Sequence, residues 1–555
     1  MCGILCEILF DPKNSITKNG EVLKRLKNRG PNSFQITSIE ISKDVTMCFC
    51  GAVLWTQGPN LTKQPVEDDK GVLLFNGDIF DPEWNKNYSD TEIIMQKFQN
   101  CTSESDITKI IKSLKGPFCI IYFNKLLKTL YFTRDRIGRG SLLLHKSEHS
   151  IIISSVLGRK HPCIELPALN IYKLNIESQK IYTYCWYSED FEVYSLDNWL
   201  NIIQIQQNLP DEQFSYENFF GDLINEDDIV EFIDEISKTY TCKQTILKEI
   251  LKHETIFKTV QTILHLLNES IKIRLELQPK KCRNCLISMN ECFHSTVGIL
   301  FSGGLDCTIL AFLADKYVQK NQTIDLINVS FKTENGTYDV PDRITGKQSY
   351  NELKQKCPTR NWVFHEVNVE KKDLEISQSQ EIADLVYPRR TVLDESLGTA
   401  LWYAAWGVGH EESACRVLLL GSGADELFGG YTRHRNAYKR EGWSGLRKEM
   451  MLDWNRISFR NLARDNRVIC DHGRIPRLPY LDENFSSFVL NLKPWFKCFP
   501  SERLGMGVGD KLMLRLVAMH LGLTDVAILP KRAIQFGTRI ANKKQNGCDV
   551  SRHMQ

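Results

Sequence analysis

The start of the chain carries a residue with the chemistry of a nucleophile. Cys2 stands directly after the initiator methionine and before the small residue Gly3. Removal of the methionine would leave a cysteine with a free α-amino group, whose pKa lies near roughly 7.7–8. Such a group is able to act as the base for its own thiol, which is the chemistry of an N-terminal nucleophile. One cysteine at the second position is weak evidence, so the hypothesis depends on the residues that follow.

Four short polar motifs follow Cys2 along the first part of the chain. Taken singly they have ordinary interpretations, because Asn-Gly is common in β-turns and Ser-Asp is common where a helix begins. Taken together and in this order they favour a functional site. The motifs are Arg29-Gly30-Pro31-Asn32, Phe75-Asn76-Gly77-Asp78, Ser89-Asp90-Thr91-Glu92 and Arg134-Asp135-Arg136-Ile137-Gly138.

This series resembles the class II glutamine amidotransferase domain, an N-terminal nucleophile fold of stacked sheets. The resemblance implies that Cys2 attacks the side-chain amide of glutamine. It also implies that Asn76 and Gly77 donate hydrogen bonds to the tetrahedral oxygen, one through a side-chain NH₂ and one through a backbone N–H. Asp90 matches the carboxylate that holds the α-amino group of glutamine.

One residue that the resemblance leads us to expect is missing. In the family an arginine on a His-Arg-Leu strand grips the α-carboxylate of glutamine, whereas the matching stretch here is Gly51-Ala52-Val53-Leu54. A buried carboxylate that loses its charge-assisted partner loses about 1.5–3 kcal/mol of binding free energy. We therefore expect weaker glutamine binding unless Arg29 takes over this contact, although an Arg-Gly-Pro run more often fixes a turn.

A glycine-rich motif lies between the apolar segment Val297–Phe301 and the helical stretch Thr308–Val318. Paired glycines let backbone N–H groups approach a phosphate, and the helix N-terminus adds its positive end. The alternative interpretation is an ordinary helix cap by a serine in a tight turn. The motif is Ser302-Gly303-Gly304-Leu305-Asp306-Cys307.

This motif resembles the pyrophosphate loop of ATP pyrophosphatases, which adenylate a substrate and release pyrophosphate. It is not a Walker loop, because no Gly-Lys-Ser/Thr is present. Asp306 is able to hold Mg²⁺ on the pyrophosphate. Cys307 stands where the family has serine, and a thiol is a weaker hydrogen-bond donor than a hydroxyl. The resemblance implies nucleotide contacts by Ser302, Gly303, Gly304, Asp306 and Cys307.

The apolar strand Val417–Leu420 leads into a third motif, Gly421-Ser422-Gly423-Ala424-Asp425-Glu426-Leu427-Phe428-Gly429-Gly430-Tyr431. Gly-x-Gly-x-Asp-Glu-x-x-Gly-Gly-Tyr after a strand closely resembles the second signature of asparagine synthetases. The resemblance implies that Gly421 and Gly423 contact the nucleotide and that Asp425 is the second Mg²⁺ carboxylate, facing Asp306. Read structurally, the acidic pair would only cap the next helix.

Two departures from the asparagine synthetase pattern concern catalysis. Ser422 replaces the glutamate credited with handling the ammonia proton, and a hydroxyl cannot act as that base near neutral pH. Counting back from Phe536 places Ala533 where the family has the lysine that stabilises adenylation. Lys531 or Arg532 would supply this charge only from a shifted register.

A further cluster of soft ligands lies just before the second domain. Cys282, Cys285, Cys292 and His294 would be able to hold Zn²⁺ tetrahedrally. Their spacing fits no standard zinc finger, and the chain is rich in cysteine. We therefore regard zinc as unlikely and expect an exposed loop with free thiols.

The elements that position these motifs differ between the two halves of the chain. The first half has short apolar runs separated by turn residues, with helices expected over Thr91–Phe98 and Ser105–Leu114, which indicates a strand-rich α+β domain. The second half alternates strands and helices, which indicates a parallel α/β sheet. The runs expected as strands in the first half are Met47–Leu54, Val72–Phe75, Phe118–Phe123, Thr129–Thr133, Ser141–Leu144 and Ile151–Ser155.

These textures divide the chain into four parts. We expect an amidotransferase-like N-terminal nucleophile sandwich over 1–185 and a connector or insertion over 186–254, which includes the acidic stretch 207–235 of unknown role. An ATP pyrophosphatase domain over 255–540 and a frayed polar tail over 541–555 follow.

The composition of the chain limits its possible partners and cellular location. The 555 residues include 70 basic and 68 acidic side chains, and this balance argues against a large nucleic-acid role. No apolar stretch is long enough to span a membrane, and the start of the chain lacks the basic region of a signal peptide. The 18 cysteines show no regular framework and are expected to be reduced, so a cytoplasmic protein is expected.

Together, the motifs predict a glutamine-dependent, asparagine synthetase-like enzyme that uses glutamine, aspartate and Mg²⁺-ATP as small-molecule substrates. Two alternatives remain at this point. The replacements at Ser422 and Ala533 are consistent with an impaired nucleotide-binding scaffold on the same fold. An amidotransferase for another carboxylate is also open, because the acceptor pocket cannot be read from sequence. Oligomeric state and protein partners are not determined.

Overall fold

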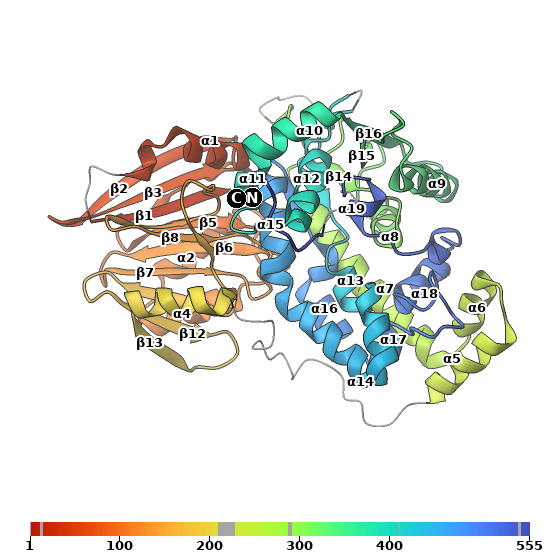
Figure 1. Ribbon diagram of the computed structural model, residues 1–555. Coiled ribbons are helices and arrows are strands. Elements are labelled where there is room, and N and C mark those ends of the chain that lie inside the picture. The colour runs from red at the N-terminus through yellow and green to blue at the C-terminus, as the bar shows by residue number, and fades with distance from the viewer. Residues whose placement is uncertain are drawn as a thin grey trace.

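Two antiparallel sheets make up the N-terminal domain of the computed structural model, which describes residues 2–10, 15–208, 228–286, 291–409, 411–541 and 546–554 (Figure 1). The first sheet has the order β10-β8-β9-β1-β3-β2. Its strands are β1 (Gly3–Leu9), β2 (Ser33–Ser42), β3 (Val45–Val53), β8 (Leu143–Lys146), β9 (Ser150–Ser154) and β10 (Ile164–Glu165). The second sheet has the order β13-β12-β11-β7-β6-β5-β4. Its strands are β4 (Val66–Glu67), β5 (Gly71–Gly77), β6 (Phe118–Asn124), β7 (Thr129–Arg134), β11 (Asn170–Asn175), β12 (Lys180–Cys185) and β13 (Phe191–Ser195).

The apolar faces of the two sheets pack on each other, which produces the expected sandwich. Alternate residues of β1, such as Ile4 and Ile8, share one core with Leu74 of β5 and Phe123 of β6. The opposite face of the second sheet packs against helices, because Phe75 on that face shares a separate core with them. The helices of this domain are α1 (Gly20–Arg29), α2 (Asp90–Gln99), α3 (Glu104–Ser113) and α4 (Leu196–Asn208).

The second sheet extends past residue 185, where we expect the domain to end. β13 pairs with β12 in antiparallel register, and Trp199 of α4 packs against the rings of Phe132 and Tyr172. Strand β13 and helix α4 are therefore part of the sandwich rather than of a connector. Within the acidic stretch 207–235, residues 209–227 lie outside the described part of the chain, residues 207–208 end helix α4, and residues 228–235 are in helix α5.

A parallel sheet is the centre of the C-terminal domain. Its order is β16-β15-β14-β17-β18, and every neighbouring pair is parallel. The strands are β14 (Val297–Leu300), β15 (Ile324–Phe331), β16 (Trp362–Val369), β17 (Val417–Leu419) and β18 (Ile475–Arg477). Helices of this half are α5 (Asp228–Thr239), α6 (Lys243–Ile250), α7 (Glu254–Glu276), α8 (Leu305–Ala314), α9 (Pro341–Lys356), α10 (Lys371–Ser377), α11 (Ala383–Val386), α12 (Val392–Trp406), α13 (Ala424–Phe428), α14 (Thr432–Ile457), α15 (Ala463–Cys470), α16 (Glu483–Asn491), α17 (Pro494–Lys497), α18 (Leu512–His520) and α19 (Ile534–Gly537).

The strand order of this sheet reverses between β14 and β17. The chain runs outward from β14 to β15 and β16, and then returns to the other side of β14 to form β17 and β18. Ligands of open α/β sheets bind outside the carboxyl ends of the strands at such a reversal. Both glycine-rich motifs follow these two strands, so the topology brings them to one crevice.

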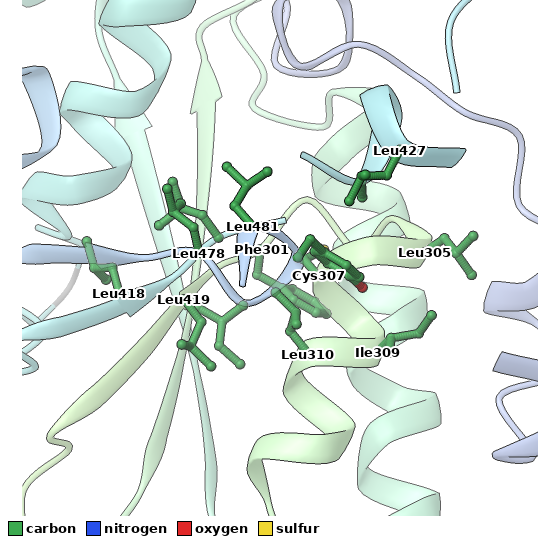
Figure 2. Packing of buried hydrophobic residues seen from close by; sticks show 14 of the residues in the cluster. Phe301, Leu305, Cys307, Ile309, Leu310, Leu418, Leu419, Leu427, Leu478 and Leu481 are labelled. Carbon is green, nitrogen blue, oxygen red and sulfur yellow. The ribbon is translucent and has the colours of Figure 1, made fainter. Parts of the chain in front are cut away.

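Packed apolar side chains hold the two motif loops against the sheet (Figure 2). Phe301 and Leu310 flank the first loop, Leu419 precedes the second, and Leu427 lies on the helix that follows it. All four belong to one continuous buried cluster. Because interiors are closely packed, this cluster limits movement of the backbone on which the candidate site residues stand.

Buried arginines of the C-terminal and N-terminal domains join the two halves. Each contacts a carboxylate of the other domain. Removing one residue of such a buried pair lowers the stability of the protein, because the remaining charge stays buried without a partner. The pairs are Arg477–Asp78 (2.9 Å), Arg139–Glu483 (2.5 Å) and Arg467–Glu165.

The expectation of a frayed tail is wrong for residues 546–554. Backbone N–H groups of Val392 and Leu393, at the start of α12, donate to carbonyl oxygens of this segment at 2.8 and 3.0 Å. Ser551 and His553 each lie 2.7 Å from a carboxylate oxygen of Glu395. The polar groups of the tail therefore form hydrogen bonds with polar groups at the start of α12.

Among the described helices, none is both long enough and apolar enough to cross a bilayer.

Candidate active sites in the two domains

Cys2 lies at the entry to β1 and is buried beneath the domain interface. Its carbonyl oxygen accepts a hydrogen bond from Nε of Arg29 at 3.3 Å, and its Sγ lies 3.9 Å from Nε2 of Gln64. Gln64 also accepts a hydrogen bond from the backbone N–H of Phe75 at 2.7 Å. The side chain of Gln64 therefore connects the thiol to the strand that carries Asn76.

Burial raises the pKa of the Cys2 thiol, and the carboxylates of Asp90 and Asp78 raise it further. The positive charge of the amino terminus and a hydrogen bond with the backbone of Leu54 act in the opposite direction. The net effect favours the protonated thiol at neutral pH. If this thiol acts as a nucleophile, it would need a neighbouring base, such as an N-terminal amine.

Asn76 and Gly77 are the last two residues of β5, and the next residue, Asp78, pairs with Arg477 of the C-terminal domain. Asn76 is fully buried, and neither its Oδ1 nor its Nδ2 has a hydrogen-bond partner among the described residues. A buried amide without partners costs free energy, so such a group in a folded chain points to a ligand. A Cβ at Gly77 would lie 2.4 Å from the carbonyl oxygen of Pro117, so the close packing there requires glycine.

Asp90 is the first residue of α2, positioned by a capping box of Ser89 and Glu92. Burial raises the pKa of Asp90 to about 7, and the neighbouring carboxylate of Asp78 contributes to the rise. An ammonium group of a ligand would lower that pKa and pair with the carboxylate. Asp90 lines a cavity of about 320 Å³ whose walls include Trp84 and, from the other domain, Pro279.

The stretch where the family has its arginine is closed by other parts of the sandwich. A Cβ at Gly51 would lie 2.5 Å from the backbone oxygen of Gln64. Nε of Arg29 donates to the carbonyl oxygen of Cys2 at 3.3 Å, and Nη2 donates to Oδ1 of Asn466 at 2.9 Å. Its Nη1 is the one nitrogen without a partner in the described residues. Arg29 thus links the backbone of Cys2 to the C-terminal domain.

The first glycine-rich loop joins β14 to α8 as expected from the sequence. Gly303 has a φ of +78°, and a Cβ there would lie 2.5 Å from Cα of Gly346. Gly304 is the N-cap of α8, and its backbone N–H donates to Oγ of Ser302 at 3.3 Å. Burial raises the pKa of Cys307 to about 11, and its thiol donates to the carbonyl oxygen of Gly304 at 3.3 Å. Cys307 therefore supports the loop from inside.

The two predicted metal carboxylates meet at one lysine that the sequence analysis missed. Nζ of Lys511 lies 2.5 Å from Oδ2 of Asp306 and 2.6 Å from Oδ1 of Asp425. Gly421 and Gly430 allow this approach, since a Cβ on either would lie within 2.9 Å of one of the two aspartates. Asp306 and Asp425 therefore form one site.

Lys511 is buried, and burial by itself would lower the pKa of its ammonium group. The carboxylates of Asp306 and Asp425 outweigh that effect and raise its pKa above the ordinary lysine value. Lys531 also contacts Asp425, and the two lysines hold the pKa of Asp425 well below its usual range despite burial. The shifted-register lysine therefore reaches the site, while Ala533 is only the N-cap of α19.

A weak signal for Lys511 was present in the sequence. It precedes α18, whose residues Leu512–His520 are nearly all apolar and buried, with Arg515 as the other strong cation of the run. An isolated lysine beside a buried helix must be paired or must lose its charge. The pattern indicates a partner but does not identify it.

Both halves of the chain are similar to known proteins. A model of the glutamine amidotransferase domain matches residues 1–184, and one of asparagine synthase matches residues 293–443. The chain is 40% identical to an asparagine synthetase domain-containing protein of Drosophila melanogaster, over 99% of this chain and 100% of that protein. It is 34% identical to asparagine synthetase domain-containing protein 1 of Homo sapiens, over 98% of this chain and 96% of that protein.

Among solved structures, a glutamine phosphoribosylpyrophosphate amidotransferase of B. subtilis is similar with a TM-score of 0.29 and 10% identity, over 65% of this chain and 90% of that chain. Fold and sites define a class in which an N-terminal nucleophile amidotransferase domain precedes a parallel-sheet domain of the ATP pyrophosphatase type. Within that class, the chain belongs to the family of asparagine synthetase domain-containing proteins.

Proposed function

We propose that the protein is a glutamine-dependent amidotransferase that forms asparagine from aspartate. The observation that carries the proposal is the meeting of Asp306 and Asp425 at Lys511, at the strand reversal where a nucleotide would bind. The amidotransferase half contributes a buried cysteine and an amide without partners in the described residues.

In the N-terminal site, Sγ of Cys2 would attack the side-chain carbonyl carbon of glutamine. The amide of Asn76 and the backbone N–H of Gly77 would donate to the oxygen as it becomes negative. Collapse of the tetrahedral species would break the C–N bond and release ammonia, and water would then release glutamate from the thioester. Asp90 would hold the α-ammonium group throughout.

In the C-terminal site, a carboxylate oxygen of aspartate would attack the α-phosphorus of ATP, and pyrophosphate would leave. Ammonia would then attack the acyl carbon, and AMP would leave with formation of the amide. Lys511 and Lys531 would neutralise the negative charge that builds on the departing pyrophosphate. Backbone N–H groups at the start of α8 would orient the phosphates.

The same site suits Mg²⁺. Oδ1 of Asp306 is a buried carboxylate oxygen with no hydrogen-bond partner in the described residues, and the carboxylate of Asp425 lies on the other side of one lysine nitrogen. Carboxylates plus substrate phosphates are the ligand set that Mg²⁺ ordinarily takes. When bound through Asp306 and Asp425, the ion would supply charge neutralisation of the triphosphate.

The test uses the purified full chain. Mass spectrometry first establishes whether the mature chain begins at Cys2, and glutamate release and pyrophosphate release are then measured with glutamine, ATP and aspartate. Cys2→Ala should abolish glutamate release while ammonium salts still support pyrophosphate release. Asp306→Ala should abolish pyrophosphate release alone.

Failure of both activities in the wild-type chain would contradict the proposal. Pyrophosphate release with another carboxylic acid and not with aspartate would keep the amidotransferase mechanism and replace the acceptor. ATP binding without turnover would instead support a nucleotide-binding scaffold.

A further inference from the structure

A group of soft metal ligands lies in the segment that connects α7 to β14, apart from both candidate active sites. Cys282, Cys285, Cys292 and His294 each offer one ligand atom, and these atoms lie within 4.8 Å of one another. The expectation of an exposed loop is wrong for two of them, because Cys282 is 0% and Cys292 8% exposed. Packing of the segment against the sheet domain accounts for that burial.

The distances match those around a tetrahedral zinc ion. Nδ1 of His294 lies 3.7 Å from Sγ of Cys282, 3.4 Å from Sγ of Cys285 and 3.8 Å from Sγ of Cys292. Bond lengths of about 2.3 Å to sulfur and 2.0–2.1 Å to nitrogen at a tetrahedral angle place sulfur and nitrogen about 3.6 Å apart. Three sulfurs therefore surround one imidazole nitrogen at the separation that a shared ion would impose.

Hydrogen bonding alone gives a poor account of this cluster. Nδ1 of neutral histidine is either one donor or one acceptor, so it cannot serve three thiols at once. All of the cysteines are free thiols, which excludes a disulfide in the cluster as the reason for the proximity. A backbone N–H also points at a sulfur, since that of Cys282 donates to Sγ of Cys292 at 3.3 Å. Such a contact stabilises a thiolate.

The surroundings complement the charge of a Cys₃His zinc site. Three thiolates and one Zn²⁺ carry a net charge of −1, and Arg283 lies within the segment itself. Arg416, which interacts electrostatically with Cys282 and Cys292, donates through Nε to the carbonyl oxygen of Lys281 at 3.0 Å. Guanidinium groups beside the site would offset the charge, as partners around a metal centre commonly do.

The segment also contacts an arginine that bridges the two domains. Arg416 bonds Trp55 of the N-terminal domain as well as the carbonyl oxygens of Lys281 and Pro279. Cys292 and Trp55 both line one open cleft of about 890 Å³. A metal ion bound by the four ligands would therefore limit the movement of the residues that contact Arg416 between the two domains.

We propose that Cys282, Cys285, Cys292 and His294 bind one structural Zn²⁺ that fixes residues 279–286 and 291–294 beside Arg416, where the two domains meet. All four tetrahedral positions are filled by protein, so no position is left for water or substrate, and the role is structural rather than catalytic. The proposal does not depend on the amidotransferase activity.

Metal analysis of the full-length protein tests the proposal. The protein is produced with zinc in the medium, freed of loosely bound metal by gel filtration, and its zinc content is measured by mass spectrometry. We expect one zinc per chain, and replacement by Co²⁺ should give the thiolate charge-transfer and tetrahedral ligand-field bands. A zinc-free protein that also fails to give these bands with Co²⁺ would overturn the proposal.

Single substitutions separate binding from folding. Cys285→Ser and His294→Ala alter the more accessible ligands and should lower zinc affinity on the order of 100-fold in a competition titration with a chromophoric chelator. Cys242→Ser, at an exposed cysteine elsewhere, is the matched control and should retain one zinc. Circular dichroism checks the fold of each variant, and zinc retained at wild-type affinity by folded Cys285→Ser and His294→Ala would count against the proposed ligand set.

Discussion

The candidate glutamine site and the candidate nucleotide site differ in how each accommodates a missing cation. In the nucleotide site, alanine stands at the expected lysine position, yet Lys511 and Lys531 reach the carboxylates from other segments. In the glutamine site, the strand that lacks arginine is covered by the backbone of Gln64. A site built from several loops can take a charge from another segment. A position inside a paired strand cannot, because register and close packing determine what lies over it.

The largest effect should come from Asp425→Asn, which keeps the size of the side chain and removes its charge. The carboxylate binds both lysines and would hold Mg²⁺, so we expect pyrophosphate release to fall about 10²–10³-fold, as for loss of a main electrostatic group. Glutamate release should stay near the wild-type rate. Equal losses in the two assays would contradict the separation of the two sites.

Lys511→Met tests whether the recruited lysine is essential to the paired carboxylates. The substitution leaves the carboxylates of Asp306 and Asp425, whose side chains are 22% and 18% exposed, without Lys511. The free energy of unfolding should therefore fall, by less than the about 3–5 kcal/mol that applies to a fully buried ion pair. Added Mg²⁺ should recover more stability in this variant than in the wild type, as measured by thermal unfolding. Lys531→Met, at a more exposed lysine, is the matched control and should lower the free energy of unfolding less. Equal destabilisation by both substitutions would contradict the conclusion that Lys511 is the main cation of this site.

Gly51→Ala tests the closed position on the glutamine side. A methyl group there would lie 2.5 Å from the oxygen of Gln64, so overpacking should destabilise the protein by about 1–3 kcal/mol. Gly20→Ala provides a control, because its Cβ would meet nothing within 4 Å. Chemical denaturation measures both, and a stable Gly51→Ala protein would show that this strand has room for a larger side chain.

The smallest effect concerns pH. Burial raises the pKa of Asp90 to about 7, so its carboxylate is protonated increasingly as pH falls below that value. Because the charged form would bind the ammonium group, kcat/KM for glutamine should decline toward tenfold per pH unit below about 7. Asp90→Asn should lower activity and remove this limb of the profile. A flat wild-type profile between pH 5 and 7 would contradict the assigned role.

Much of the fold and part of each site followed from local patterns. The runs Phe118–Phe123 and Thr129–Thr133 are strands, and Thr91–Phe98 is helical, because period and turn residues act over a few neighbours. The two glycine-rich loops were predicted at the ends of apolar strands for the same reason. Strand β13 and the docking of residues 546–554 were not, because their partners lie on distant segments.

By itself the sequence determined the kinds of elements and the positions of the two glycine-rich motifs at strand ends, since each depends on neighbouring residues. Only the tertiary structure decided that Lys511 lies between Asp306 and Asp425 and that Arg477 pairs with Asp78. These contacts join residues far apart in the chain. Their geometry follows from how sheets and helices pack, which no local pattern encodes.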